Sequence, residues 1–172
     1  MKKNKVVKDL MIDVFKYPHV PYWFTIRQTM MIIKKSLIES EKHFYPLAIL
    51  IFDEKYNLLG TLSMKDIIRG LEPRFMKTSE KAQAYISEEK ELSIIWDTLF
   101  TKESKQLAEK PVSDIMVPAK FFVEPDDPIT KAAYIMISHG LDLLPVLDNK
   151  KFVGLIRMPE IFDELSNVIL KE

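Results

Sequence analysis

The residues best suited to binding chemistry lie in one short segment, Gly60-Thr61-Leu62-Ser63-Met64-Lys65-Asp66. In it a hydroxyl residue, Ser63, is followed three positions later by an acid, Asp66, at the predicted start of a helix. Such a pair can form a helix cap and nothing more. Free amides at a helix start can also bind phosphate, and a carboxylate can accept hydrogen bonds from both hydroxyls of a ribose. The segment therefore predicts either a cap or part of a nucleotide site.

Patterns for catalysis and metal binding are missing from the sequence. The chain has 4 glycines and no glycine-rich phosphate loop. It has no cysteine, and its histidines (His19, His43 and His139) share no metal-ligand spacing. An enzyme that used Asp66 or Glu160 as a general base would need a second catalytic group, which we do not find. We therefore expect no enzymatic activity.

Composition and charge narrow the class of protein. The 172 residues are 47% hydrophobic, enough for one globular unit or two small ones. The 25 basic and 25 acidic residues cancel, which argues against a nucleic-acid partner. The longest apolar runs, such as residues 47–52, are far shorter than the roughly 20 residues that span a bilayer. With no signal-peptide pattern and no cysteine, we expect a cytoplasmic protein without a membrane partner.

The chain contains an internal repeat. Val-Lys-Asp-Leu-Met at residues 7–11 is matched by Val-Ser-Asp-Ile-Met at residues 112–116. Each copy closes with an apolar run that stops at an aspartate, a polar turn and a second apolar run, which predicts a β-hairpin. Gly60 and Gly154 lie early in the returning strands, where a glycine marks a bulge or the close approach of a ligand or a neighbouring element.

A helix is predicted before each hairpin, and another after it. Apolar residues fall on one helical face in both copies. Glycines at 70 and 140 are placed to end helices in the left-handed conformation. Each copy therefore reads strand, helix, strand, strand, helix. The residues that define the apolar faces are Ile26, Met30, Ile33 and Leu37 in the first copy, and Ile129, Ala132, Ala133, Met136 and Ile137 in the second.

An insertion at residues 73–109 separates the copies. It carries an amphipathic stripe that we expect to pack on its own domain or, alternatively, to form a dimer helix. The residues of this stripe are Leu92, Ile95, Trp96, Leu99 and Phe100.

Taken in order and twice over, these motifs resemble a tandem pair of CBS domains, also called a Bateman module. The resemblance covers about residues 5–72 and 110–166. It implies an α/β (α+β) fold in which two βαββα repeats pack through their sheets with pseudo-two-fold symmetry. It also implies clefts between the repeats that take an adenosine ligand: AMP, ADP, ATP or S-adenosylmethionine. Modules of this family sense ligands and do not catalyse reactions.

Carried over residue by residue, the resemblance assigns a first cleft. Asp66 matches the ribose-binding aspartate and Ser63 the hydroxyl residue beside it. The base pocket is expected from the opening segment of the other repeat. Because Asp142 would repel a long polyphosphate, AMP is the favoured ligand. The residues expected in this cleft are Thr61, Ser63, Asp66, Ala119, Lys120, Phe121, Asp142 and Leu143.

In the second cleft the corresponding positions are Arg157 and Glu160. A guanidinium can hold a phosphate and Glu can still accept from two hydroxyls, so a changed specificity and an empty cleft are both open. A third possibility is a local surface ion pair between the two. Tyr17 and His19 would line this cleft if it were occupied. We expect one nucleotide to bind tightly per chain.

The predicted function is that of a free-standing regulatory module that senses an adenine nucleotide and transmits its presence to a partner. The partner is expected to be a second copy, giving a homodimer, or an unknown effector protein. The alternative is a ligand-free scaffold of the same fold, which binds a protein through the stripe of the insertion.

Overall fold

The computed structural model describes residues 5–39, 48–71 and 102–170. The apolar stripe of the insertion lies outside these residues. The strands are β1 Ile12–Asp13, β2 His19–Pro21, β3 Ala48–Phe52, β4 Leu58–Ser63, β5 Val117–Pro118, β6 Leu143–Asp148 and β7 Lys151–Arg157. The α-helices are α1 Ile26–Glu39, α2 Met64–Gly70, α6 Lys102–Leu107, α7 Ile129–His139 and α8 Met158–Ile169, with short 3-10 turns η1 Val7–Asp9, η2 Val14–Lys16 and η3 Val112–Asp114.

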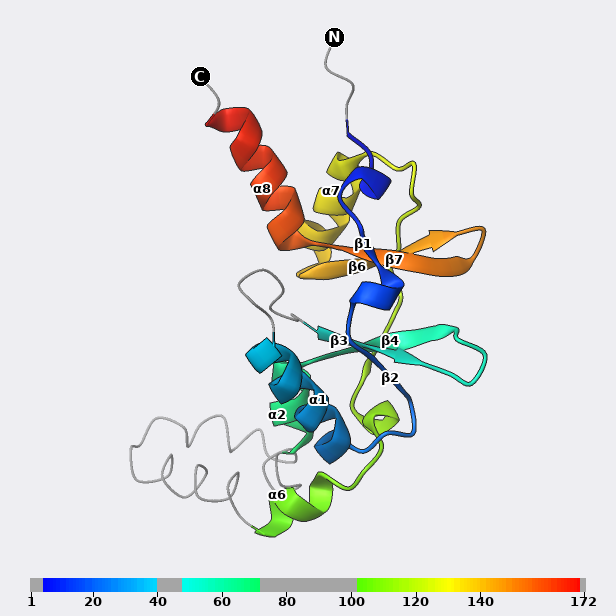
Figure 1. Ribbon diagram of the computed structural model, residues 1–172, viewed down its shortest axis with the longest axis vertical. Helices are drawn as coiled ribbons and strands as arrows, with labels where there is room; N and C mark the ends of the chain where they lie inside the picture. Colours follow the sequence, from blue (N-terminus) through cyan, green and yellow to red (C-terminus); the bar gives the residue numbers. More distant parts are fainter. Residues whose placement is uncertain (1–4, 40–47, 72–101, 171–172) are drawn as a thin grey trace.

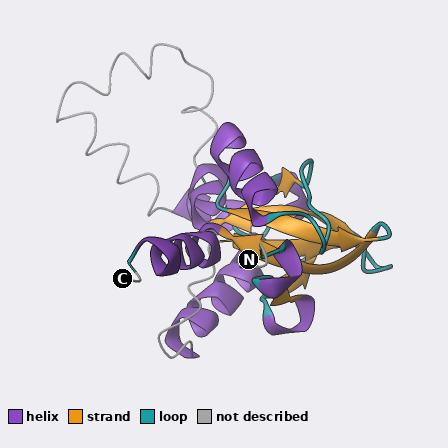
Figure 2. Ribbon diagram, turned by 90° about the horizontal axis from the view of Figure 1, so that it is seen from above, coloured by secondary structure: helices purple, strands orange, loops and turns teal. Residues whose placement is uncertain are grey.

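The two repeats stand one above the other, and each is built around the predicted hairpin. The hairpins β3–β4 and β6–β7 project to the same side of the molecule, while α1, α2, α7 and α8 lie to the other side (Figure 1). Seen from above, the strands of the two sheets lie over one another (Figure 2). The predicted α+β fold of two packed repeats is confirmed.

The repeats exchange their opening strands. The four-stranded sheet has the order β2-β3-β4-β5, and the three-stranded sheet the order β1-β7-β6. Strand β5, from the start of the second repeat, pairs antiparallel with β4 of the first, and β1 pairs in the same way with β7 of the second. Gly60 lies opposite Pro118 and Gly154 opposite Asp13 at these pairings. The close approach expected at the two glycines is therefore that of a neighbouring strand.

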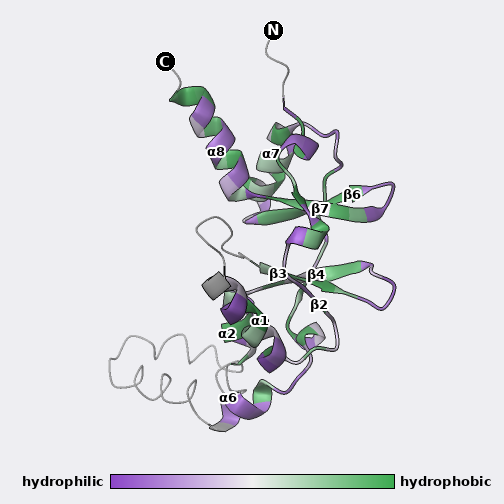
Figure 3. Ribbon diagram, viewed as in Figure 1, coloured by the Kyte–Doolittle hydropathy of each residue, from purple (hydrophilic) through white to green (hydrophobic). Residues whose placement is uncertain are grey.

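Three hydrophobic clusters hold the described residues together. One cluster lies in each repeat, and the third lies between the sheets and joins the repeats. Val7 belongs to the cluster of the second repeat and Val112 to that of the first, so packing crosses the sequence ranges 5–72 and 110–166. The buried residues of the joining cluster are Ile12, Tyr17, Ala48, Leu50, Phe52, Leu143 and Leu155. In Figure 3 the central strands are accordingly the most continuously hydrophobic elements.

Helix α1 begins with a reciprocal cap that its sequence explains. The amide of Thr25 donates to Oε1 of Gln28 at 2.9 Å, and the amide of Gln28 donates to Oγ1 of Thr25 at 3.1 Å. The helix buries Ile26, Thr29 and Ile33, whereas Met30, expected on the buried face, is 42% exposed. The buried face of α1 is formed by Ile26, Thr29 and Ile33, so Met30 lies at the edge of this face.

The two glycines predicted to end helices differ. Gly140 follows α7 with φ of 61° and ends it in the left-handed conformation, as predicted. Gly70 is the last residue of α2 and is not left-handed, so that prediction was wrong. A β-carbon there would lie 2.7 Å from a methyl carbon of Ile115, and Gly70 serves close packing instead.

Candidate ligand-binding site

Ser63 and Asp66 form a reciprocal cap at the junction of β4 and α2. The amide and the hydroxyl of Ser63 donate to Oδ2 of Asp66 at 2.9 and 2.6 Å. In return the amide of Asp66 donates to Oγ of Ser63 at 3.2 Å. The cap predicted as the simpler interpretation is therefore present, and it fixes both side chains at the end of the strand.

The cap uses only one of the two carboxylate oxygens. Among the residues that the structure describes, none donates a hydrogen bond to Oδ1 of Asp66, and its nearest cationic atom is Nη1 of Arg69 at 4.0 Å. The Asp66 side chain is 14% exposed. An ionised carboxylate has about four acceptor sites. Asp66 therefore keeps capacity for further donors after capping α2.

The expected base wall, the segment after β5, crosses from one repeat to the other. It starts beside β4, where the amide of Ala119 donates to the carbonyl of Leu59 at 3.1 Å. It ends beside β6, where Val123 forms a parallel bridge with Val146. Between these points the ring of Phe121 stacks on His139, with 3.9 Å between ring centres. The segment is thus held at both ends, while its middle residues stay exposed.

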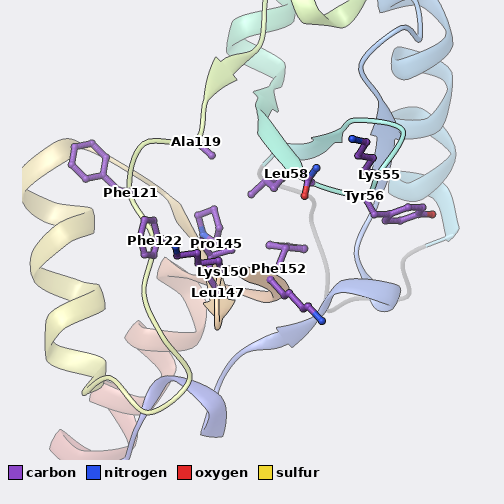
Figure 4. A pocket seen from close by; sticks show the side chains of 12 residues that line it. Lys55, Tyr56, Leu58, Ala119, Phe121, Phe122, Pro145, Leu147, Lys150 and Phe152 are labelled. Atoms are coloured by element: carbon purple, nitrogen blue, oxygen red, sulfur yellow. The ribbon is translucent and has the colours of Figure 1, made fainter.

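A pocket of about 450 Å³ lies between the tips of the two hairpins and this crossing segment (Figure 4). Residues from both repeats surround it, so its shape depends on how the repeats are placed. The residues that line it are Lys55, Tyr56, Asn57, Leu58, Ala119, Phe121, Phe122, Pro145, Leu147, Lys150, Lys151 and Phe152.

The pocket suits a flat, anionic ligand. Three of its lining residues are lysines and none is acidic. The nearby Asp53 is engaged in its own turn, because its carboxylate accepts from the side chain and amide of Asn57, and these hydrogen bonds lower its pKa. Tyr56 and Lys150 both have a left-handed backbone, with φ of 62° and 66°, which is uncommon outside glycine. Both hairpin turns thus carry a strained residue at the pocket.

The predicted first-cleft residues divide between the pocket and the cap. Ala119 and Phe121 line the pocket. Ser63 and Asp66 lie at the other end of β4 from Leu58, about 16 Å along the strand. Lys120 and Asp142 are exposed and Thr61 is half-buried.

Leu143, also predicted for the first cleft, is 7% exposed and packs in the cluster between the sheets. The cap and the pocket lie at the two ends of β4, beside which the crossing segment begins.

The hairpin-tip residues of the pocket were not predicted from the sequence. They belong to two turns far apart in the sequence, at 53–57 and 148–151, which face each other only because the repeats pack symmetrically. The internal repeat could have predicted them, because the equivalent turns of two pseudo-symmetric repeats lie at equivalent places in the fold.

Three of the residues predicted for the second cleft, Tyr17, Arg157 and Glu160, contact one another. Nε of Arg157 donates to Oε2 of Glu160 at 2.9 Å, and Nη2 donates to Oε1, so both carboxylate oxygens are taken. The Arg157 side chain is 3% exposed, and its guanidinium carbon lies 6.0 Å from the ring centre of Tyr17. The ion pair considered from the sequence exists, but it is buried and not on the surface.

Tyr17 closes this cleft from the first repeat. Its side chain is buried, and the amide of Ala48 donates to its hydroxyl at 3.5 Å. Burial raises the pKa of Tyr17, while Ala48 and the charge and hydrogen bond of Arg157 act in the opposite direction. His19, also expected in the second cleft, lies beside Tyr17, with its Nδ1 2.9 Å from the Tyr17 carbonyl oxygen, and packs its ring on Phe52 and Tyr56, at 5.7 and 6.1 Å between ring centres.

No group of three or more potential metal ligands occurs in the described part of the chain. No helix among those residues is long and apolar enough to cross a membrane.

Comparison with known proteins identifies the family. A family model named CBS domain matches residues 112–167, which is the second repeat. The second repeat is a CBS domain. No curated protein matches it.

Solved structures share the fold of nearly the whole chain. The protein CBSX2 in complex with AMP has a TM-score of 0.63 and 15% identity, covering 95% of this chain and 97% of that one. A CBS domain-containing protein of unknown function from Bacillus anthracis has a TM-score of 0.67 and 21% identity, over 95% and 94% of the chains.

The cytosolic domain of the Mg²⁺ channel MgtE, in complex with ATP, has a TM-score of 0.60 and 19% identity over 92% of this chain and 48% of that one. The CBS chain described here therefore spans about half of that domain. At these identities the likeness is one of fold.

Proposed function

We propose that this CBS pair is a regulatory module that binds one adenine nucleotide per chain in its first cleft. The observation that carries the proposal is the contrast between the two equivalent strand–helix junctions, β4–α2 and β7–α8. Asp66 keeps one carboxylate oxygen without a hydrogen bond from any described residue, whereas Arg157 takes both oxygens of Glu160. Only at the first junction does a carboxylate oxygen face no donor from the described residues, which leaves it open to ribose hydroxyls.

The surroundings of the first cleft support a nucleotide. In this proposal the ribose lies at Asp66, and the ligand extends along the edge of β4 toward Ala119, where the crossing segment begins. The lysines of the pocket give the site a positive potential, which favours an anion. Two proteins of the same fold were crystallised with AMP and with ATP. AMP is the favoured ligand because Asp142 would repel a longer phosphate chain.

The test is a calorimetric titration of AMP into the wild-type chain and the Asp66→Asn variant. Asparagine keeps an acceptor for the Ser63 cap but removes the charge, so folding should be retained. A charge-assisted hydrogen bond is worth roughly 1.5–3 kcal/mol, so affinity should fall about 10- to 100-fold. Asp126→Asn is the matched control, since Asp126 is 83% exposed and is not among the residues expected in the cleft or lining the pocket. Equal affinity of Asp66→Asn and wild type would refute the site.

We also propose that occupancy is passed on through a second copy of the chain. Helix α8 buries Ile161 and exposes apolar side chains on its outer face, where Figure 3 shows hydrophobic residues alternating with polar ones. The most exposed are Phe162, Leu165, Val168, Ile169 and Leu170, at 55–78%. Exposed apolar clusters of this kind mark interaction surfaces. A homodimer, or an effector that replaces the second copy, would cover this face.

A further inference from the structure

The second cleft contains a buried cation in the position where the first cleft has a small hydroxyl. Arg157 stands at the end of β7 and precedes α8, as Ser63 stands at the end of β4 and precedes α2. Glu160 follows Arg157 by three residues, as Asp66 follows Ser63. The two junctions are thus equivalent in topology and differ in the side chains they carry.

The guanidinium is fully engaged where it lies. It binds both oxygens of Glu160, and the Tyr17 ring lies beside it. At 3% exposure it is nearly inaccessible, and Glu160 is only 21% exposed. Such a buried, bidentate pair is costly to break from one side, because a charge is then left without its partner.

The contact also joins the repeats. Tyr17 belongs to the first repeat and is 3% exposed, with its ring in the cluster between the sheets. Arg157 and Glu160 belong to the second.

We propose that the Arg157 side chain occupies the second cleft in place of a ligand. There it excludes nucleotide and stabilises the contact between the two repeats. The inference deepens the proposed function, since it makes the first cleft the side on which ligand occupancy changes the geometry of the pair. At the second cleft the contact between the repeats then stays the same whether or not ligand is bound.

A double-mutant cycle, measured by thermal unfolding, tests without any ligand whether Arg157 and Tyr17 stabilise the contact between the repeats. Four chains are compared: wild type, Tyr17→Leu, Arg157→Met and the double variant. Each single variant should lower the melting temperature by several degrees, about 5–10 °C for a chain of this length. The double variant should lose clearly less than the sum of the two, because one shared contact is removed twice. Additive losses would overturn the proposal.

A matched control separates this effect from the loss of any ion pair. Lys131 and Asp127 are joined at 2.7 Å within one repeat, and the Lys131 side chain is 49% exposed. Lys131→Met should change the melting temperature little and should not couple to Tyr17→Leu.

Titration with AMP tests the exclusion. The Arg157→Ser/Glu160→Asp variant copies the residue types of the first cap, and it should bind a second AMP where the wild type binds one. Two AMP molecules on the wild type, with one lost in Arg157→Ser, would show that the guanidinium recognises the ligand and would overturn the proposal. A wild type that binds no AMP at all would count against the proposed function, while the unfolding cycle would still decide the role of Arg157.

Discussion

Gly60 lies directly against the main chain of Val117, since a β-carbon on Gly60 would lie 2.5 Å from the Val117 carbonyl oxygen. Gly154 stands in the equivalent relation to Ile12, at 2.4 Å. Side-chain β-carbons are essentially never found within 3.0 Å of such an atom. The two glycines therefore allow each repeat to receive the opening strand of the other.

Gly60→Ala and Gly154→Ala should each destabilise the fold by about 1–3 kcal/mol, because the exchanged strand has to move away. Urea unfolding gives the free energy directly. Gly140→Asn is the control, because Gly140 has open space around it and asparagine tolerates its left-handed backbone. Gly60→Asn should lower the free energy of unfolding strongly, whereas Gly140→Asn should leave it nearly unchanged. A loss below about 0.5 kcal/mol at Gly60, typical of a surface position, would contradict the crowding argument.

Phe122 should contribute to nucleotide affinity. It is 51% exposed, lines the pocket and belongs to the crossing segment, so an aromatic base can stack on it at little structural cost. Stacking of a base on an aromatic side chain is worth about 1–3 kcal/mol, so Phe122→Ala should weaken AMP binding roughly 5- to 100-fold. Titration of the variant checks this.

Phe15→Ala is the matched control for Phe122→Ala, because Phe15 is 84% exposed and does not line the pocket. Its AMP affinity should equal that of the wild type. If both variants bind AMP as the wild type does, the base does not stack on the crossing segment.

Asp127 should make stability depend on acid pH. Burial alone would raise its pKa, but the hydrogen bonds from the Glu124 amide at 2.8 Å and the Lys131 ammonium at 2.7 Å outweigh burial and lower it. A carboxyl whose pKa is lower in the folded state stabilises the fold at neutral pH. The contribution is lost as the pH falls from about 3.9, the unfolded value, through the folded pKa.

Asp127→Asn should therefore lower the free energy of unfolding at pH 7 by about 0.5–1 kcal/mol, because the ion pair with the exposed Lys131 is lost while an amide oxygen can still accept from the Glu124 amide. The difference from the wild type should shrink below pH 4, and unfolding measured across pH 2–7 shows it. A difference that stays constant over this range would mean that the charge of Asp127 has no role.

Local structure was predictable from the sequence where near neighbours determine it. The hairpins follow from apolar runs around a polar turn, and the Ser63–Asp66 cap follows from the side chains themselves. Met30 was misplaced because four-residue spacing alone does not show which flank of a helix is buried. The neighbouring Thr29, a polar residue, is the one with 0% exposure.

Long-range pairing was harder to predict. Gly60 and Gly154 indicated that something lies close, but not that the opening strands change places. The burial of Arg157 contradicts the usual behaviour of a charged side chain and is understandable only once Tyr17 is seen beside it. The pocket was missed for the same reason, because its walls come from two distant turns.

The outer face of α8 should be the surface through which two copies of the chain associate. Phe162, Leu165 and Ile169 follow one another at intervals of three and four residues, so they lie on one face of the helix, and each is more than half exposed. The wild-type chain should be a dimer in light scattering at micromolar concentration, because a symmetric second copy is the commonest cover for such a face. Phe162→Ser/Ile169→Ser should give a folded monomer, since neither side chain is buried within the chain. Phe15→Ser, which alters an equally exposed residue of the first repeat, should remain dimeric. A monomeric wild type would remove the homodimer and leave a separate effector as the partner for α8, whereas a double variant that stays dimeric would place the interface elsewhere.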